Sequence, residues 1–124
     1  MTEPYGLLLT RDLMFTSKVT GTASVLGWRV ETVSSLEGLA QRVSEATPRV
    51  VFVDLNCTDF EPAGVMNVLK QSRPSCVIAF GSHVDETRLA QARDAGCDEV
   101  MPRSKFSATL PQLLSSIFET SKSS

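Results

Sequence analysis

Val50-Val51-Phe52-Val53-Asp54 is an uninterrupted apolar run that ends in a carboxylate, and Leu55-Asn56 follow directly. A run without polar alternation is typical of a strand that a parallel sheet buries on both faces. Open parallel sheets place their ligands at the carboxyl ends of the strands. The stretch therefore predicts a central strand that carries Asp54 to the edge of the sheet where chemistry takes place.

Four further segments have the composition of strands. The apolar runs at about 5–10 and 76–81 predict two buried strands. Polar and apolar residues are mixed at 28–33, as in a half-exposed edge strand, and 99–101 predicts a short fifth strand. Pro102 cannot donate a backbone hydrogen bond, so the fifth strand should lie at a sheet edge or end near this residue.

The segments between the strands have the apolar spacing of helices. One helix is predicted at about 12–26, one after Ser34, and two more at about 61–71 and 85–94. The apolar face of the last helix comprises Leu110, Leu113, Leu114, Ile117 and Phe118.

Capping signals mark several helix ends. The pattern Thr109-x-x-Gln112, with Pro111 in the first turn, predicts the start of the last helix. Ser34-x-x-Glu37 predicts the start of the second helix in the same way. Gly27 and Gly96 suit the left-handed turn that ends a helix, so the first and fourth helices are expected to end there.

Five strands that alternate with five helices predict a doubly wound α/β domain, in which a parallel sheet has helices on both faces. The chain has 124 residues, of which 42% are apolar and 21% charged, and this suits one domain over 1–124 with a polar tail at about 120–124. The sequence therefore predicts one compact core and no second domain.

Composition argues against several function classes. The 12 basic and 14 acidic residues give a net charge of -2 without a basic stripe, which disfavours nucleic acid as a partner. No apolar stretch approaches the ~20 residues of a membrane span. Met1-Thr2-Glu3-Pro4 lacks the pattern of a signal peptide, so a cytoplasmic location without membrane contact is expected.

The cysteines and the common catalytic motifs give no sign of an enzyme. Cys57, Cys76 and Cys97 are an odd number at wide spacings, and His83 is the only histidine, so reduced thiols are expected rather than a metal or redox site. The chain has no G-x-G-x-x-G, no P-loop and no G-x-S-x-G. An enzymatic activity therefore has no group of residues to support it.

Polar residues gather after the predicted strands. Asp12 follows the first strand, and Asp54 and Asn56 follow the third, so two carboxylates and an amide or carbonyl oxygen are expected at one edge of the sheet. Oxygen ligands of this kind are those that Mg²⁺ accepts. Arg103, after the fifth strand, would add a cation at the same point.

Two matches carry a resemblance to a known family. Asp54-Leu55 ends the third strand, and Ala95-Gly96-Cys97-Asp98-Glu99 precedes the fifth. In these residues the chain resembles the receiver domain of bacterial response regulators, over roughly 5–118. The resemblance implies a flavodoxin-like sheet of order 2-1-3-4-5, Asp54 as phosphoacceptor, and Asp12 and the Asn56 carbonyl as Mg²⁺ ligands.

Four positions depart from the pattern of that family. Arg11 replaces the first acidic residue, and it would compete with Mg²⁺ if it turned inward to Asp54 or Asp12. Gly81 replaces a threonine or serine, which leaves Ser82 as the nearest hydroxyl for a phosphate. Arg103 replaces a lysine and could still bind phosphate oxygens.

The fourth departure is Val100, which stands where the family has an aromatic switch residue. The usual relay from phosphate to surface is therefore expected to be impaired.

Three functions remain open from the sequence. The first is a receiver-like signalling module with an atypical acidic pocket, which binds a sensor kinase or output domain through a surface containing Arg88, Val100 and Met101. The second is a working Mg²⁺-dependent phosphoacceptor, phosphorylated on Asp54. The third is a flavodoxin-like ligand-binding protein or enzyme, suggested by Thr20-Gly21-Thr22, although these residues fall inside a predicted helix and not in a strand-to-helix loop.

Overall fold

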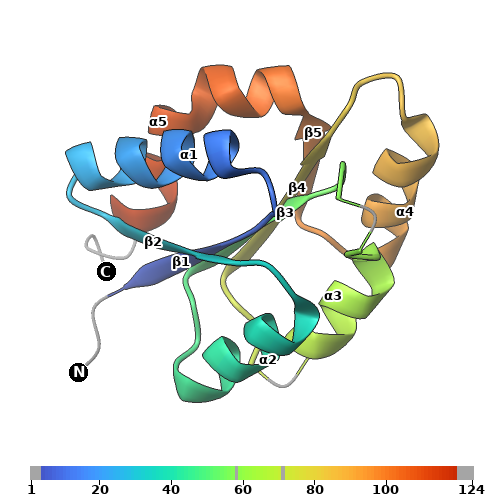
Figure 1. Ribbon diagram of the computed structural model, residues 1–124, viewed down its shortest axis with the longest axis horizontal. Coiled ribbons are helices and arrows are strands. Elements are labelled where there is room, and N and C mark those ends of the chain that lie inside the picture. The colour runs from blue at the N-terminus through green and yellow to red at the C-terminus, as the bar shows by residue number, and fades with distance from the viewer. Residues whose placement is uncertain (1–3, 58, 71, 120–124) are drawn as a thin grey trace.

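The computed structural model describes residues 4–57, 59–70 and 72–119, in which strands and helices alternate along the chain (Figure 1). The predicted polar tail at 120–124 lies outside the described residues, as does Gln71 at the predicted end of the third helix. The elements are β1 (Tyr5–Leu9), α1 (Leu13–Val25), β2 (Arg29–Val33), α2 (Leu36–Glu45), β3 (Val50–Asp54), α3 (Pro62–Leu69), β4 (Cys76–Gly81), α4 (Glu86–Ala95), β5 (Glu99–Pro102) and α5 (Arg103–Glu119).

The five strands form one parallel sheet in the order β2-β1-β3-β4-β5, which confirms the predicted fold class and strand order. β3 is central and completely buried, as its unbroken apolar run indicates. The edge strands are β2 and β5, which are the two strands whose sequences predicted an edge position. In the register of β1 with β3, Leu9 lies opposite Val53, so the tips of these two strands end side by side.

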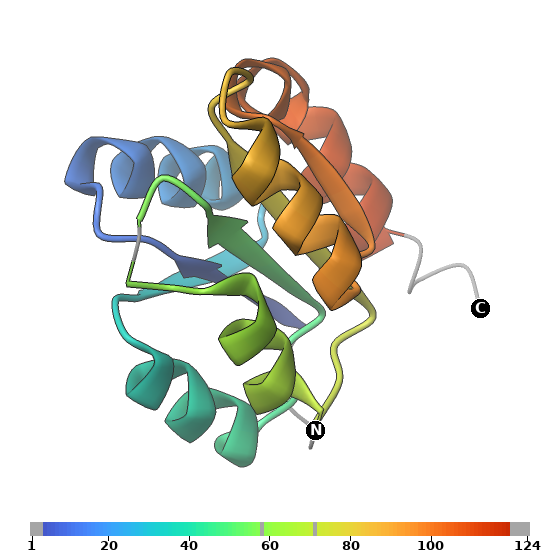
Figure 2. The same cartoon turned by 90° about the vertical axis from the view of Figure 1, so that its right-hand side faces the viewer.

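Helices cover both faces of the sheet (Figure 2). α1 and α5 pack on one face, and α2, α3 and α4 pack on the other. Since alternate residues of a strand point to opposite faces, Leu8 joins the core under α1 and α5, whereas Leu7 and Leu9 join the core under the other three helices.

A group of phenylalanines joins α1 and α5 to the sheet. The Phe80 and Phe106 rings stack with their centroids 4.3 Å apart, and Phe15 stacks on Phe80 at 4.8 Å. Phe52 meets the edge of Phe106 at 5.2 Å. Because Phe15 and Phe106 lie in the first turn of their helices, this packing fixes the starts of α1 and α5 above the ends of β3 and β4.

Two helix starts differ from the prediction. α2 is capped by Ser35, whose hydroxyl accepts from the Gly38 N–H at 2.9 Å, and not by Ser34. α5 starts at Arg103 and not at Thr109, whose hydroxyl donates to the Lys105 carbonyl within the helix. The prediction was wrong because the buried face of α5 begins one turn before Leu110, at Phe106, and repeats every four residues through Leu114 and Phe118.

The two glycines end their helices as predicted. Gly27 has φ 84° and Gly96 has φ 101°, a left-handed conformation that a Cβ atom disfavours. Each turn leads directly into the next strand.

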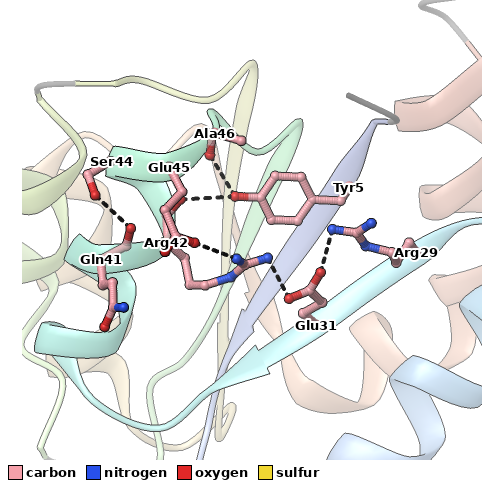
Figure 3. A network of polar contacts seen from close by, with 8 residues as sticks. All are labelled: Tyr5, Arg29, Glu31, Gln41, Arg42, Ser44, Glu45 and Ala46. Atoms are coloured by element: carbon pink, nitrogen blue, oxygen red, sulfur yellow. Dashed lines mark hydrogen bonds and ion pairs between the residues drawn. The ribbon is translucent and has the colours of Figure 1, made fainter. Parts of the chain in front are cut away.

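A polar network ties the first strand to its neighbours at the amino ends of the strands (Figure 3). The Tyr5 hydroxyl donates to the Ala46 carbonyl at 2.6 Å, and the guanidinium groups of Arg29 and Arg42 each lie 5.3 Å from the centre of the Tyr5 ring. Glu31 forms an ion pair with both arginines. The network lies at the opposite end of the sheet from Asp54, and it joins β1, β2 and α2.

Truncation of Phe106 tests the aromatic packing. Phe106→Ala should lower the free energy of unfolding by about 3–5 kcal/mol, because the side chain is fully buried against three other rings. Urea unfolding measures the change. Val25→Ala is the control: its side chain is 87% exposed, so the change should stay below about 0.5 kcal/mol. A loss under about 1 kcal/mol in Phe106→Ala would contradict the packing described.

Candidate functional site

Asp54 ends β3 and is only 2% exposed. A buried carboxylate must be hydrogen-bonded, because its desolvation is costly. One carboxylate oxygen, Oδ2, accepts from the Thr10 hydroxyl at 2.7 Å, and the other, Oδ1, accepts from the Asn56 backbone N–H at 3.0 Å. Asp54 is therefore held by one neighbour on the adjacent strand end and one in its own loop.

Thr10 belongs to this site, although the sequence did not single it out. It is 1% exposed, and its hydroxyl oxygen also accepts from the Asp12 N–H at 3.1 Å. The register explains its position: Leu9, the last residue of β1, pairs with Val53, and the next residues along the chain are Thr10 and Asp54. Strand alternation alone does not reveal Thr10, because its contact with Asp54 depends on β1 and β3 being neighbours in the sheet.

Asp12 and Arg103 form an ion pair at the mouth of the site. The Asp12 Oδ2 accepts from an Arg103 terminal nitrogen at 2.7 Å, and its Oδ1 caps α1 by accepting from the Phe15 N–H at 3.1 Å. The guanidinium lies 4.3 Å from the centre of the Phe15 ring, in a cation–π contact. The hydrogen bond from Arg103 is the largest cause that lowers the pKa of Asp12 below its ordinary value.

Arg11 does not turn inward. Its guanidinium forms an ion pair with Asp59, and the side chain is 62% exposed. The residue is free to face outward because β1 has already ended and the chain turns toward α1. The cation that contacts Asp12 is therefore Arg103, and the pairing of Arg11 with Asp54 or Asp12 that the sequence allowed does not occur.

These residues surround an open pocket of about 270 Å³ at the carboxyl end of the sheet. Asp12, Asp54 and Arg103, which follow or end β1, β3 and β5, lie together at this edge, as the sequence predicted. The lining residues are Arg11, Asp12, Asp54, Asn56, Cys57 and Arg103.

The carboxylate oxygens of the pocket already accept hydrogen bonds. Arg103 holds Asp12, and both oxygens of Asp54 accept hydrogen bonds within the protein. Across residues 4–57, 59–70 and 72–119, no group of three or more His, Cys, Asp or Glu side chains is placed to hold a metal ion. A dication at this point would have to compete with the guanidinium for Asp12.

Gly81 and Ser82 offer no hydroxyl to the pocket. Ser82 does not line it: its N–H donates to the Asn56 side-chain oxygen at 3.3 Å, and its hydroxyl accepts from the Val84 N–H. A Cβ atom at Gly81 would lie 3.0 Å from the Leu55 Cβ. The glycine thus permits the close approach of Leu55, and a larger side chain at this position would need Leu55 to shift by a few tenths of an ångström.

The surface predicted for a protein partner is largely inaccessible. Met101 is only 4% exposed because it packs in the core under α1 and α5, and Val100 is half-buried against the opposite core. The Arg88 side chain is 15% exposed and bonds backbone carbonyls of the β3–α3 loop. The burial of Met101 contradicts its place on an exposed surface, whereas the roles of Arg88 and Val100 in partner binding stay predictions.

Thr20-Gly21-Thr22 lies inside α1, as the sequence indicated, and not in a strand-to-helix loop. In the part of the chain that the structure covers, no helix has the length and apolar character needed to cross a membrane.

No protein-family profile and no curated protein matches the sequence, but solved structures match the fold. A response-regulator signal receiver domain from Bermanella marisrubri superposes with a TM-score of 0.78 at 18% identity, over 94% of this chain and 98% of that one. The fold is that of a receiver domain.

Two further neighbours share this receiver fold. A response regulator from Thermotoga maritima matches with a TM-score of 0.77 at 13% identity, over 95% of this chain and 99% of that one. The receiver domain of a sensor histidine kinase from Pseudomonas aeruginosa matches with a TM-score of 0.77 at 12% identity, over 95% and 99% of the two chains. The latter has a magnesium ion coordinated in its active-site cleft. At these identities the likeness concerns the receiver fold alone.

The Asp12–Arg103 ion pair can be tested by titration. In Arg103→Met the pKa of Asp12 should rise, because removal of the hydrogen-bonded cation destabilises the carboxylate. Carboxyl ¹³C NMR measures this pKa. Arg11→Met is the matched control and should leave Asp12 unchanged, since Arg11 pairs with Asp59.

The same pair gives the fold a pH dependence. The folded-state pKa of Asp12 lies below the ordinary value of 3.8, so the pair stabilises the fold above that pH and ceases to do so as the pH falls through the folded-state pKa. An unchanged Asp12 titration in Arg103→Met would contradict the ion pair.

Two of the thiols should react slowly. Burial raises the pKa of Cys76 and of Cys97 to about 11, against an ordinary value of 9.0. Near neutral pH the thiolate fraction of each is then roughly hundredfold smaller than that of an ordinary thiol. Iodoacetamide labelling followed by mass spectrometry should show much slower alkylation of both residues in the folded protein than in urea. Equal rates in the two states would refute this prediction.

Proposed function

We propose that this chain is a receiver-like signalling module of a bacterial two-component or phosphorelay system, and that it acts in the cytoplasm by binding a protein partner without enzymatic activity of its own. The observation that carries the proposal is the Asp12–Arg103 ion pair, at 2.7 Å, in a pocket of receiver-domain position. In this proposal the pocket is held by its own cation and does not depend on Mg²⁺.

The chemistry of phosphoryl transfer supports this view. Transfer to a carboxylate requires a free nucleophilic oxygen and a dication that neutralises the transferring phosphoryl oxygens. Here Mg²⁺ would have to displace Arg103 from Asp12, and the guanidinium is also held over the Phe15 ring. Each oxygen of the Asp54 carboxylate also already accepts one hydrogen bond, from the Thr10 hydroxyl or from the Asn56 N–H, which lowers its nucleophilicity. We therefore infer that the donor set does not fit Mg²⁺ in this arrangement.

The region next to the pocket also supports a function other than the usual relay. Movement of a hydroxyl toward a bound phosphoryl group would require a hydroxyl side chain at position 81, where the chain has glycine and where a Cβ atom would lie 3.0 Å from the Leu55 Cβ. Val100 has no ring that could rotate in response. We infer that a signal reaches the partner by a route other than this pair of residues.

Exposed apolar side chains around the pocket support a protein as the partner. Leu13 and Met14 at the start of α1 are 81% and 85% exposed, and Val84 in the β4–α4 loop is 76% exposed. Both segments follow carboxyl ends of parallel strands, so they border the same edge of the sheet as Asp54. Exposed apolar groups beside a polar pocket favour a sensor kinase or an output domain over a nucleic acid.

The alternative is a working phosphoacceptor. It is favoured by the place of Asp54 in the pocket and by the magnesium ion in the cleft of the Pseudomonas aeruginosa neighbour. In that case Mg²⁺ and a phosphoryl group would together replace the Asp12–Arg103 pair.

Amide NMR with Mg²⁺ separates the two possibilities. Wild-type protein should show no saturable shifts of the Asp12, Asp54 and Asn56 amides at millimolar Mg²⁺, with or without beryllofluoride as a phosphoryl mimic. Arg103→Gln should gain Mg²⁺-dependent shifts at Asp12, because its carboxylate is released. Arg11→Gln is the control and should behave like the wild type.

Saturable wild-type shifts that require both Mg²⁺ and beryllofluoride would contradict the proposal and establish the phosphoacceptor instead.

A further inference from the structure

Arg88, in the first turn of α4, binds three backbone carbonyls of one loop. Its Nε donates to the Leu55 carbonyl at 2.6 Å, and a terminal nitrogen lies 3.2 Å from the Phe60 carbonyl and 3.4 Å from that of Cys57. The side chain is 15% exposed. All three acceptors belong to the connection between β3 and α3, which also carries Asn56.

The guanidinium group suits this role because of its shape. Its donors form a rigid planar fork that can serve several acceptors together, whereas an ammonium is a single point charge. Glu61 lies 3.5 Å from another terminal nitrogen and is 63% exposed, so it offsets the charge from the solvent side. The partners of Arg88 are thus three carbonyl dipoles inside and one carboxylate outside.

In the described residues of this connection, the backbone hydrogen bonds made within it are long, and the Leu55 N–H donates outward to the Phe80 carbonyl of β4 at 2.8 Å. The Cys57 N–H donates to the Asp54 carbonyl at 3.2 Å, and the Phe60 N–H donates to the Cys57 carbonyl at 3.3 Å. In the residues described, the carbonyls of Leu55, Cys57 and Phe60 all accept hydrogen bonds from the Arg88 side chain. A loop whose internal hydrogen bonds are long depends on external groups for its shape, and Arg88 serves three of its carbonyls.

We propose that Arg88 is a positioning residue that folds the β3–α3 loop around its guanidinium and so places the Asn56 N–H against the Asp54 carboxylate. The cation that organises this loop is a side chain of α4, and no metal ion is needed for it. The loop and α4 consequently move as one unit, which links the pocket to a helix on the surface. This role is separate from the proposed function, because it holds whether or not Asp54 accepts a phosphoryl group.

Hydrogen exchange in Arg88 variants tests the proposal. Arg88→Met keeps much of the apolar stem and removes every donor, so the amides of Asn56, Cys57 and Phe60 should exchange at least about tenfold faster, as expected when a charge-assisted hydrogen bond is lost. The Asn56 amide is the decisive readout, since Arg88 does not touch it. Arg88→Lys should recover part of the protection, because one ammonium reaches fewer carbonyls.

Arg93→Met is the matched control: it changes an exposed arginine of the same helix and should leave the loop amides unchanged. The Leu7 and Leu8 amides in β1 report global stability, so exchange rates are compared with theirs. Unchanged Asn56 exchange in Arg88→Met would overturn the proposal. A uniform acceleration that includes β1 would overturn it as well, because it would assign Arg88 to overall stability.

Discussion

The burial of the Asp54 carboxylate at the tip of the central strand is the constraint around which this end of the molecule is built. Its oxygens accept from the Thr10 hydroxyl and the Asn56 N–H, so the end of β1 and the loop after β3 must both close over it. Thr10 in turn accepts from the Asp12 N–H, and the Asp12 carboxylate caps α1. A single buried charge thereby sets the positions of two loops and one helix start.

Besides Arg11, which pairs with Asp59, the guanidinium groups of Arg103 and Arg88 supply positive charge in this region. Arg103 pairs with Asp12 at the mouth of the pocket, and Arg88 of α4 donates hydrogen bonds to carbonyls of the β3–α3 loop. Both are covalent parts of the chain, so the positive charge does not depend on the supply of a free ion. The receiver fold is retained, while the donors on which metal-dependent phosphoryl transfer would rely are paired internally. This combination is what favours partner binding over phosphorylation as the function.

The sequence predicted what depends on local pattern. Apolar runs gave the strands, the mixed composition of β2 gave an edge, and Gly96 gave a helix end. What depends on packing was missed. The start of α5 follows from the contact of Phe106 with Phe80, which no capping motif reveals, and the capping signal at Thr109 was misleading for that reason. The role of Thr10 required the neighbouring position of β1 and β3.

The same cause explains the error at Met101, which is buried in the core under α1 and α5, and the contacts of Arg88, whose carbonyl partners lie in the β3–α3 loop.

The most direct test of the account is the intact mass of the protein after incubation with a small phosphodonor and Mg²⁺. Internal pairing of the Asp12 and Asp54 carboxylates predicts no mass increase, and it predicts that Asp54→Asn behaves like the wild type. An increase by one phosphoryl group that is lost in Asp54→Asn would contradict the account, because Asp54 would then be a working phosphoacceptor despite its internal partners.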